Sequence, residues 1–233
     1  PGKEYATKEL LFADLRINAE KIIAIKKATI YESEKKGALV TSFVDITKID
    51  ADVTKVGPHM KDGYIYPVIN TTNYLDGHGD VHFDGTFKKS AKEQNGKLFY
   101  VADHKMETDK IIAWPSDVNV MLKSIPWAAV GKDYAGMTEG LIYEIDKNKI
   151  VNKTAAQIIA ENRPVQNSVR MQYVTIRLAM NSDNPNDKEY KAYFDSKIEL
   201  IANKDLALSA GYFFGVEEAK IVTEGSMVPL GSN

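Results

Sequence analysis

Glycine, proline, asparagine and aspartate divide this sequence into many short segments, and most of those segments have the composition of strands. These four residue types favour turns, so few long regular elements can run through the chain. No internal repeat or low-complexity segment appears. We therefore expect an α+β fold that is rich in strands, with helices inserted between strands instead of alternating with them.

The expected strands are concentrated in the first half of the chain. Residues 22–31 (IIAIKKATIY) and 38–46 (ALVTSFVDI) predict two strands of a hairpin around a turn at residues 34–37. Residues 64–71 predict a strand at a sheet edge or with a bulge, because Pro67 has no N–H to donate. We expect residues 1–62 to form an N-terminal hairpin region packed on a main domain of residues 63–233.

Three helices are predicted. Residues 86–94 have helix-forming composition and stop at Asn95-Gly96, and residues 154–162 form a helix with Thr154 as its cap. Residues 187–203 carry an apolar stripe at helical spacing, formed by Tyr190, Tyr193, Phe194, Ile198 and Ile201. This third helix lies between predicted strands at residues 169–180 and 212–223. We expect its stripe to be buried, and its exposure would instead indicate an oligomer or partner interface.

Charge and cysteine content narrow the functional classes. The 233 residues include 30 basic and 32 acidic side chains, giving a net charge of -2, and no basic run could neutralise a row of phosphates. Nucleic acid is therefore not an expected partner, and neither is a membrane, because no apolar stretch approaches the length of a bilayer span. The absence of cysteine excludes a thiol nucleophile and leaves Ser, Thr, Lys or a carboxylate.

Histidines are few and gather in one part of the chain. His78, Asp80 and His82 follow one another at two-residue spacing, and His104 comes later, so a metal-dependent hydrolase is one hypothesis. In an extended segment the first three side chains would share a face without converging. The alternative is a turn, strand and turn over residues 76–85, and we expect no metal and no cofactor.

A second hypothesis is nucleophilic catalysis by serine. Residues 98–102 predict a short strand that delivers Asp103 and His104 at its end, where catalytic groups are commonly presented. Ser168 and Ser226 lie in or near the C-terminal strands, as do three glutamates, Glu217, Glu218 and Glu224. Spacing alone does not select a triad from this set.

Four segments in order resemble the prohead, or head-maturation, serine proteases of tailed phages. Residues 76–87 (DGHGDVHFDGTF) are similar to the family's D-x-x-x-D-V-x-x-x-G-x-F/W element, and residues 100–104 (YVADH) to its strand ending in Asp-His. Residues 167–174 (NSVRMQYV) are similar to its H-S-V/I-G-M-x-Y-V segment. Residues 211–214 and 218–233 resemble its closing strands, with an acidic residue followed by S-x-V. The resemblance covers residues 63–233.

The resemblance implies a catalytic constellation. His104 would be the general base, Ser168 the nucleophile and Glu224 the group that orients the histidine, with Glu218 and His82 as weaker candidates for that third role. Val169 and Arg170 would lie in the oxyanion region. The strand that begins near Ser168 would run beside the strand that delivers His104. The fold implied is a barrel-like core with helices, related to the herpesvirus assemblin fold.

The resemblance also implies a biological setting. Substrates would be scaffold and major capsid proteins, the site of action the immature phage head in the bacterial cytoplasm, and a homo-oligomer is an open alternative to a monomer. The chain departs from the family pattern at Arg170, where the family has glycine, and at Asn167, where histidine is frequent. A catalytically inactive capsid-assembly or scaffolding homologue is therefore the main alternative.

Overall fold

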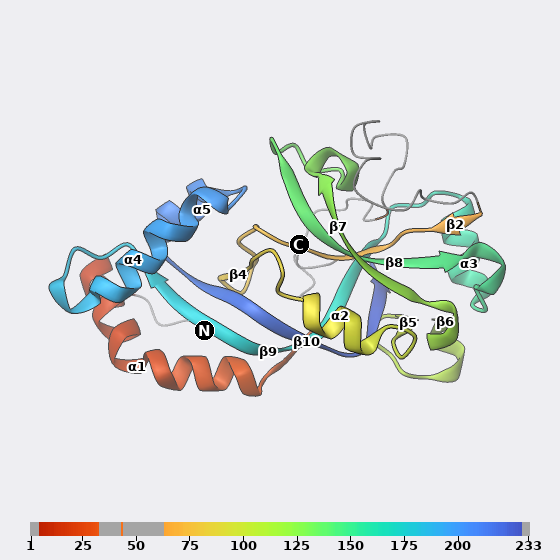
Figure 1. Cartoon of the computed structure of the whole chain (residues 1–233), viewed down its shortest axis with the longest axis horizontal. Coiled ribbons are helices and arrows are strands. Elements are labelled where there is room, and N and C mark those ends of the chain that lie inside the picture. The colour runs from red at the N-terminus through yellow and green to blue at the C-terminus, as the bar shows by residue number, and fades with distance from the viewer. Residues whose placement is uncertain (1–4, 33–42, 44–62, 230–233) are drawn as a thin grey trace.

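The structure, a computed structural model, describes residues 5–32, Phe43 and residues 63–229. It is a mixed α+β protein, 37% helical and 36% strand, built on a curled sheet that forms a half barrel. Two long strands, β9 and β10, run side by side through the whole molecule (Figure 1). The α+β class is thus confirmed, whereas the expected dominance of strands is not, because helix and strand are present in nearly equal amounts.

The main sheet has the strand order β1-β9-β10-β5-β6, with β4 also paired to β10. Strand β10 is antiparallel to β9 but parallel to both β4 and β5. The strands span Ile30–Tyr31 (β1), Asp80–His82 (β4), Phe99–Ala102 (β5), Ile111–Ala113 (β6), Gln166–Met180 (β9) and Tyr212–Val228 (β10). Strand β10 therefore lies at the centre of the sheet.

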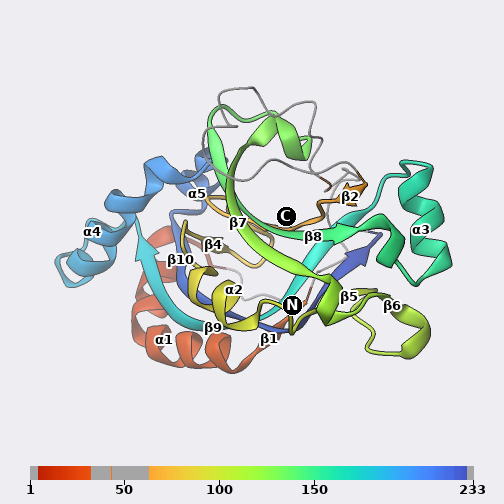
Figure 2. The same ribbon diagram turned by 45° about the vertical axis from the view of Figure 1, so that its right-hand side comes forward.

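A second, four-stranded sheet is built around β8, which pairs with β2, β3 and β7. Its strands span Tyr64–Ile65 (β2), Val68–Thr71 (β3), Asn119–Pro126 (β7) and Met137–Asp146 (β8). Figure 2 shows β7 and β8 curving over β9 and β10. Pro67 separates β2 from β3, and a register shift follows between Val68 and Asn70, so the predicted interruption of this strand is confirmed.

The predicted N-terminal hairpin is wrong in its first strand. Residues Lys8–Ala28 form helix α1, and only Ile30–Tyr31 of the predicted strand is extended. Thr7 caps the helix, and Phe12, Leu15 and Ala19 form a buried stripe that packs in the core under β9. The second predicted strand lies outside the described residues except for Phe43, which forms an isolated bridge with Pro67.

The other predicted helices are present with changed boundaries. Helix α2 spans Lys88–Gln94, and α3 spans Lys153–Ala160. Asn152, not Thr154, caps α3, because its side chain accepts the Ala155 N–H at 2.9 Å. The third predicted helix, residues 187–203, corresponds to α4 (Lys188–Lys197) followed by a 3-10 turn, Ile198–Leu200. A further helix that was not predicted, α5 (Lys204–Ala210), follows it.

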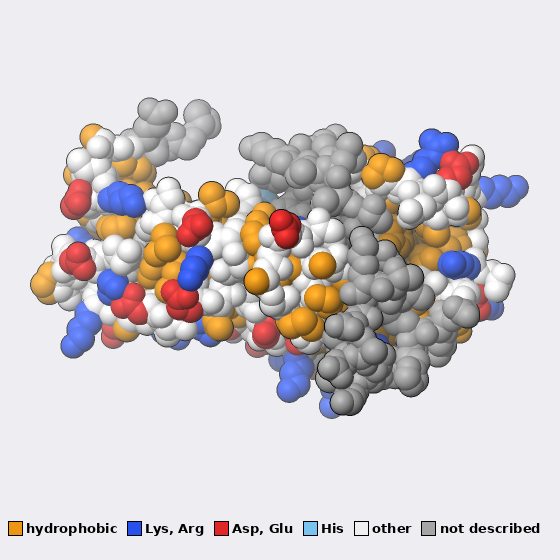
Figure 3. Space-filling view, turned by 90° about the horizontal axis from the view of Figure 1, so that it is seen from above, with side chains coloured by type: hydrophobic (Ala, Val, Ile, Leu, Met, Phe, Trp, Pro, Cys, Tyr) orange, Lys and Arg blue, Asp and Glu red, His pale blue; other side chains and the backbone are white. Residues whose placement is uncertain are grey.

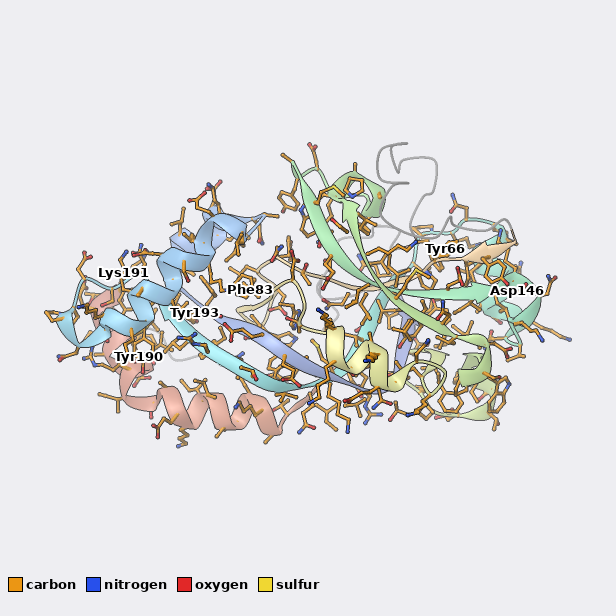
Figure 4. All side chains as sticks on the ribbon, in the orientation of Figure 1. Tyr66, Phe83, Asp146, Tyr190, Lys191 and Tyr193 are labelled. Carbon is orange, nitrogen blue, oxygen red and sulfur yellow. The ribbon has the colours of Figure 1, made fainter. Side chains whose placement is uncertain are left out.

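The apolar stripe of α4 is buried, as predicted. Tyr193, Phe194, Ile198 and Ile201 are buried in a satellite cluster with Phe213, and Tyr190 is half-buried against the main core. Tyr193 and Phe83 approach β10 closely at Gly215, where a Cβ would lie 2.3 Å from the Tyr193 hydroxyl (Figure 4). Glycine at this position lets α4 pack directly on the strand.

The surface of the described residues carries mixed charge. In Figure 3, basic and acidic side chains alternate with apolar ones on the face that is seen from above. None of the helices that the structure describes combines the length and the apolar character needed to cross a bilayer.

Candidate active site

A tight turn at the end of β5 presents His104. Asp103 and His104 both have positive φ, 55° and 56°, a conformation that costs free energy for residues with side chains, although Asp and His tolerate it better than most. Three hydrogen bonds hold the turn. Asp103 N–H donates to the Met227 carbonyl at 2.9 Å, Lys105 N–H to the Ala102 carbonyl at 3.1 Å, and His104 N–H to Ser226 Oγ at 2.8 Å. Strain of this kind is found preferentially at functional sites.

The His104 ring contacts a buried carboxylate. Its Nδ1 lies 2.8 Å from Glu224 Oε1, and the two side chains are 8% and 0% exposed. Burial raises the pKa of Glu224, while the hydrogen bond to His104 and the positive charges of His104 and Arg170 oppose that rise. An Nδ1–H that donates to Glu224 fixes the ring in the tautomer with Nε2 as the acceptor.

A bulge in β10 sets the direction in which the Glu224 side chain points. The register with β9 shifts between Ile221 and Gly225, and Thr223 has a positive φ of 69°. The next residue, Gly225, lies against the second sheet, since a Cβ there would be 2.8 Å from the Tyr143 ring and 3.0 Å from Ile69. Side chains alternate along a strand, so Glu224 and Ser226 project from the opposite face.

Ser168 lies on that same face. It is the direct cross-strand partner of Ser226, and directly opposed side chains of a sheet have their Cβ atoms about 4.5–5.5 Å apart. Ser226 Oγ in turn accepts from His104 N–H. The expectation that the strands of Ser168 and His104 run side by side is wrong, because β10 lies between β9 and β5. The intervening strand itself supplies Glu224 and Ser226.

Ser226 is the less suitable nucleophile of the two serines. It is fully buried, accepts from His104 N–H and contacts the Val101 carbonyl at 3.2 Å. Its hydroxyl therefore holds the turn of β5 in place. Ser168 is 6% exposed and lines a small pocket at the sheet surface.

The residues of the expected oxyanion region point in different directions. Val169 is buried in the main core. Arg170 Nε lies 3.3 Å from Glu32 Oε1, so the guanidinium is paired with the segment that follows β1. Arg170 lowers and Glu32 raises the pKa of Glu224, so both charges lie near that carboxylate. Nothing in the sequence indicates that Glu32 belongs to this group, because the contact requires β1 to pair with β9.

Of the three candidates for orienting the histidine, the structure brings Glu224 to His104. Glu218 pairs with Lys89 at 3.4 Å instead. The His82 ring packs between Phe87 and Tyr173, and burial lowers the pKa of His82 to about 3, so this ring is neutral.

The pocket beside Ser168 has a second histidine on its wall. It has a volume of about 10 Å³, room for one water molecule. Besides Ser168, its polar lining includes Asn70, Asp76 and His78. Burial and the nearby charge of Asp80 raise the pKa of Asp76 to about 7. His78 is thus the alternative base that sequence spacing did not suggest for Ser168.

The residues of the metal hypothesis serve other contacts. Asp80 accepts from Lys26 Nζ at 2.5 Å and from the Tyr173 hydroxyl at 2.8 Å. His104 belongs to the separate turn at the end of β5. Across the described part of the chain, no group of three or more histidine, aspartate or glutamate side chains is placed to hold a metal ion.

The chain was compared with protein-family models, with curated proteins and with solved structures. None of the three comparisons found a match.

Proposed function

We propose that this chain is a serine endopeptidase that processes scaffold and major capsid proteins during phage head maturation. The observation that carries the proposal is the buried His104–Glu224 pair, 2.8 Å apart, on the sheet face to which Ser168 projects. The half-barrel sheet supports the proposed barrel-like core. The place of action proposed is the assembling head in the bacterial cytoplasm.

In the proposed mechanism, Ser168 Oγ attacks the scissile carbonyl carbon while His104 Nε2 takes the hydroxyl proton. A C–O bond forms and the carbonyl π bond opens to an oxyanion. His104 then returns the proton to the leaving amine as the C–N bond breaks. Water hydrolyses the acyl-enzyme by the same sequence, with His104 again acting as base.

Glu224 stabilises the histidine cation that forms in each step. Because the carboxylate is fully buried, its attraction for the imidazolium is screened far less than it would be in water. The backbone N–H of Val169 or that of Arg170 is the proposed donor to the oxyanion, a contribution of about 3 kcal/mol. The two cannot serve together, because successive N–H groups of a strand point to opposite sides. The Arg170 side chain, paired with Glu32, would leave the space above its own backbone open.

The test is co-expression of the chain with a cognate scaffold or capsid precursor. Processed fragments should appear with the wild type and vanish with Ser168→Ala and with His104→Ala, because nucleophile and base act as one unit. His78→Ala is the matched control and should retain processing. Processing that survives His104→Ala but not His78→Ala would assign the base to the pocket wall instead.

Arg170→Gly separates a weak protease from an inactive assembly protein. If the arginine supplies positive charge near the oxyanion, glycine lowers cleavage; if the arginine obstructs the substrate, glycine raises it. The proposal is overturned if neither the wild type nor Arg170→Gly processes a cognate precursor at neutral pH. The inactive capsid-assembly homologue is then the better account, and its test is a defect in head assembly when the chain is deleted.

A further inference from the structure

Helix α1 carries three large apolar side chains that are exposed to solvent. The α4 stripe, which would have indicated an oligomer interface if exposed, is buried. Helix α1 differs because it is apolar on two sides. Phe12, Leu15 and Ala19 face the core, whereas Leu10, Ile17 and Ile25 are 55%, 78% and 56% exposed. Large exposed apolar side chains that gather on one surface, bordered by polar residues, indicate a contact site.

The three exposed side chains lie along one line of the helix. Leu10, Ile17 and Ile25 are separated by seven and eight residues, which is two turns each, so they form a single outward stripe about 22 Å long. Figure 1 shows α1 at the lower edge of the molecule, with its outer side turned away from the sheets. A stripe of this length fits another helix better than a flat surface.

The charges within the stripe are complementary to a copy of themselves. Asp14 lies between Leu10 and Ile17, and Lys21 lies between Ile17 and Ile25. About a two-fold axis beside residues 17 and 18, an antiparallel second copy of the helix would place Leu10 against Ile25 and Asp14 against Lys21. Both contacts then occur twice, as in any isologous interface.

We infer that this stripe joins two copies of the chain through an antiparallel α1–α1 contact. The stripe is narrow, and interfaces below about 1,200 Å² in total belong to the weak class. The dimer is therefore concentration-dependent, with a dissociation constant on the order of micromolar. Sedimentation velocity should show a monomer–dimer equilibrium for the wild type, and Ile17→Asp should abolish it. Because Ile17 is 78% exposed, this variant keeps its fold.

Single cysteine substitutions test the geometry of the proposed dimer. No native cysteine competes with them, since the chain has none. Ile17→Cys, close to the axis, should form disulfide-linked dimers on mild oxidation. Leu10→Cys alone should not, because its partner would lie at the far end of the stripe. A mixture of Leu10→Cys and Ile25→Cys should give the mixed dimer in preference to either self-linked product.

Leu206→Cys on α5 is the matched control, because Leu206 is 59% exposed, close to Leu10 at 55% and Ile25 at 56%, but lies off the stripe. It reports cross-linking by random collision. A wild type that stays monomeric at all soluble concentrations overturns the inference, as does Ile17→Cys that links no faster than Leu206→Cys. Efficient self-linking of Leu10→Cys would contradict the antiparallel direction.

Discussion

Two buried clusters of ionisable side chains lie at the two ends of strand β10, and they differ in how completely their carboxylates are bonded. In the cluster near β4, which we call the Asp80 cluster, Asp80 accepts from Lys26 through one oxygen and from Tyr173 through the other. In the His104 cluster, Glu224 Oε1 contacts the ring, whereas Oε2 has no hydrogen-bond partner among the described residues.

This difference distinguishes a carboxylate with a structural role from one that is a candidate for catalysis. A buried carboxylate with a partner at each oxygen is accounted for by its structural contacts. A buried carboxylate that is bonded only to a histidine, beside a strained turn, is typical of a site where charge changes during a reaction. Similar residue types therefore lead to different roles, and the number of bonds at each oxygen is what distinguishes them.

The largest expected effect is on catalysis. Glu224→Gln should lower the rate of precursor cleavage about 10³–10⁴-fold, because the amide no longer holds the tautomer or stabilises the imidazolium. Residual cleavage should remain above that of Ser168→Ala. Asp80→Asn, in the other cluster, should cleave at near the wild-type rate where it is folded. Equal losses of activity in both variants would remove the distinction between the clusters.

A large loss of stability is expected for Lys26→Met. This change leaves Asp80 buried without its cation, and breaking a buried pair costs about 3–5 kcal/mol. The free energy of unfolding from urea denaturation measures the loss. Lys26→Met combined with Asp80→Asn should recover much of it, since the uncompensated charge is gone. A single variant within 1 kcal/mol of the wild type would show that Asp80 needs no cation.

A pH-dependent effect is expected at Asp76. Burial and the charge of Asp80 raise the pKa of Asp76 to about 7 in the folded state, above the ordinary aspartate value that applies when the chain is unfolded. Stability due to the protonated carboxyl is thus complete below about pH 4 and is lost as the pH rises through 7. Asp76→Asn should be more stable than the wild type at pH 8 and equal to it at pH 4.

This prediction has a built-in control in the hydrogen bonds of Asp76. Its Oδ1 accepts N–H groups from His78 at 2.8 Å and from Asp80 at 3.0 Å, which an asparagine oxygen can also accept. Urea denaturation across this pH range measures the difference. A constant difference between the two proteins at all pH values would contradict the raised pKa.

The smallest of these effects is expected for Gly225→Ala, which tests the packing behind the His104 cluster. The added methyl would lie 2.8 Å from the Tyr143 ring, so the second sheet must shift, at a cost of about 1–3 kcal/mol. The same shift should lower cleavage, because Gly225 separates Glu224 from Ser226. Gly140→Ala is a milder control, since its nearest contact is a flexible Ile125 methyl group at 3.1 Å.

The short elements of the fold could be predicted from local sequence. Strand β5 with Asp103 and His104 at its end, helix α2, and the buried face of α4 all follow from periodicity and turn residues. Helix α1 was missed because its isoleucine-rich end has strand composition. The Thr7 cap and the packing of Phe12, Leu15 and Ala19 under β9 outweigh that preference.

The candidate site could be predicted only in part. The sequence indicated Ser168, His104 and Glu224 through a resemblance, and it left the choice among Glu224, Glu218 and His82 open. The structure brings Glu224 to the histidine by a bulge at Thr223, and a bulge changes which way a side chain points by adding one residue to one strand. No local pattern in the sequence marks that residue.

By itself the sequence determined the mixed α+β class, the exclusion of thiol chemistry and the Asp-His ending of β5, because each depends only on which residues are present and how neighbours are spaced. The tertiary structure alone decided that β10 separates β9 from β5, that Glu32 meets Arg170, and that α1 keeps an exposed apolar stripe. These features depend on pairings between segments that are far apart in the chain. The free energy of such pairings comes from burial and cross-strand contacts, which the order of adjacent residues does not determine.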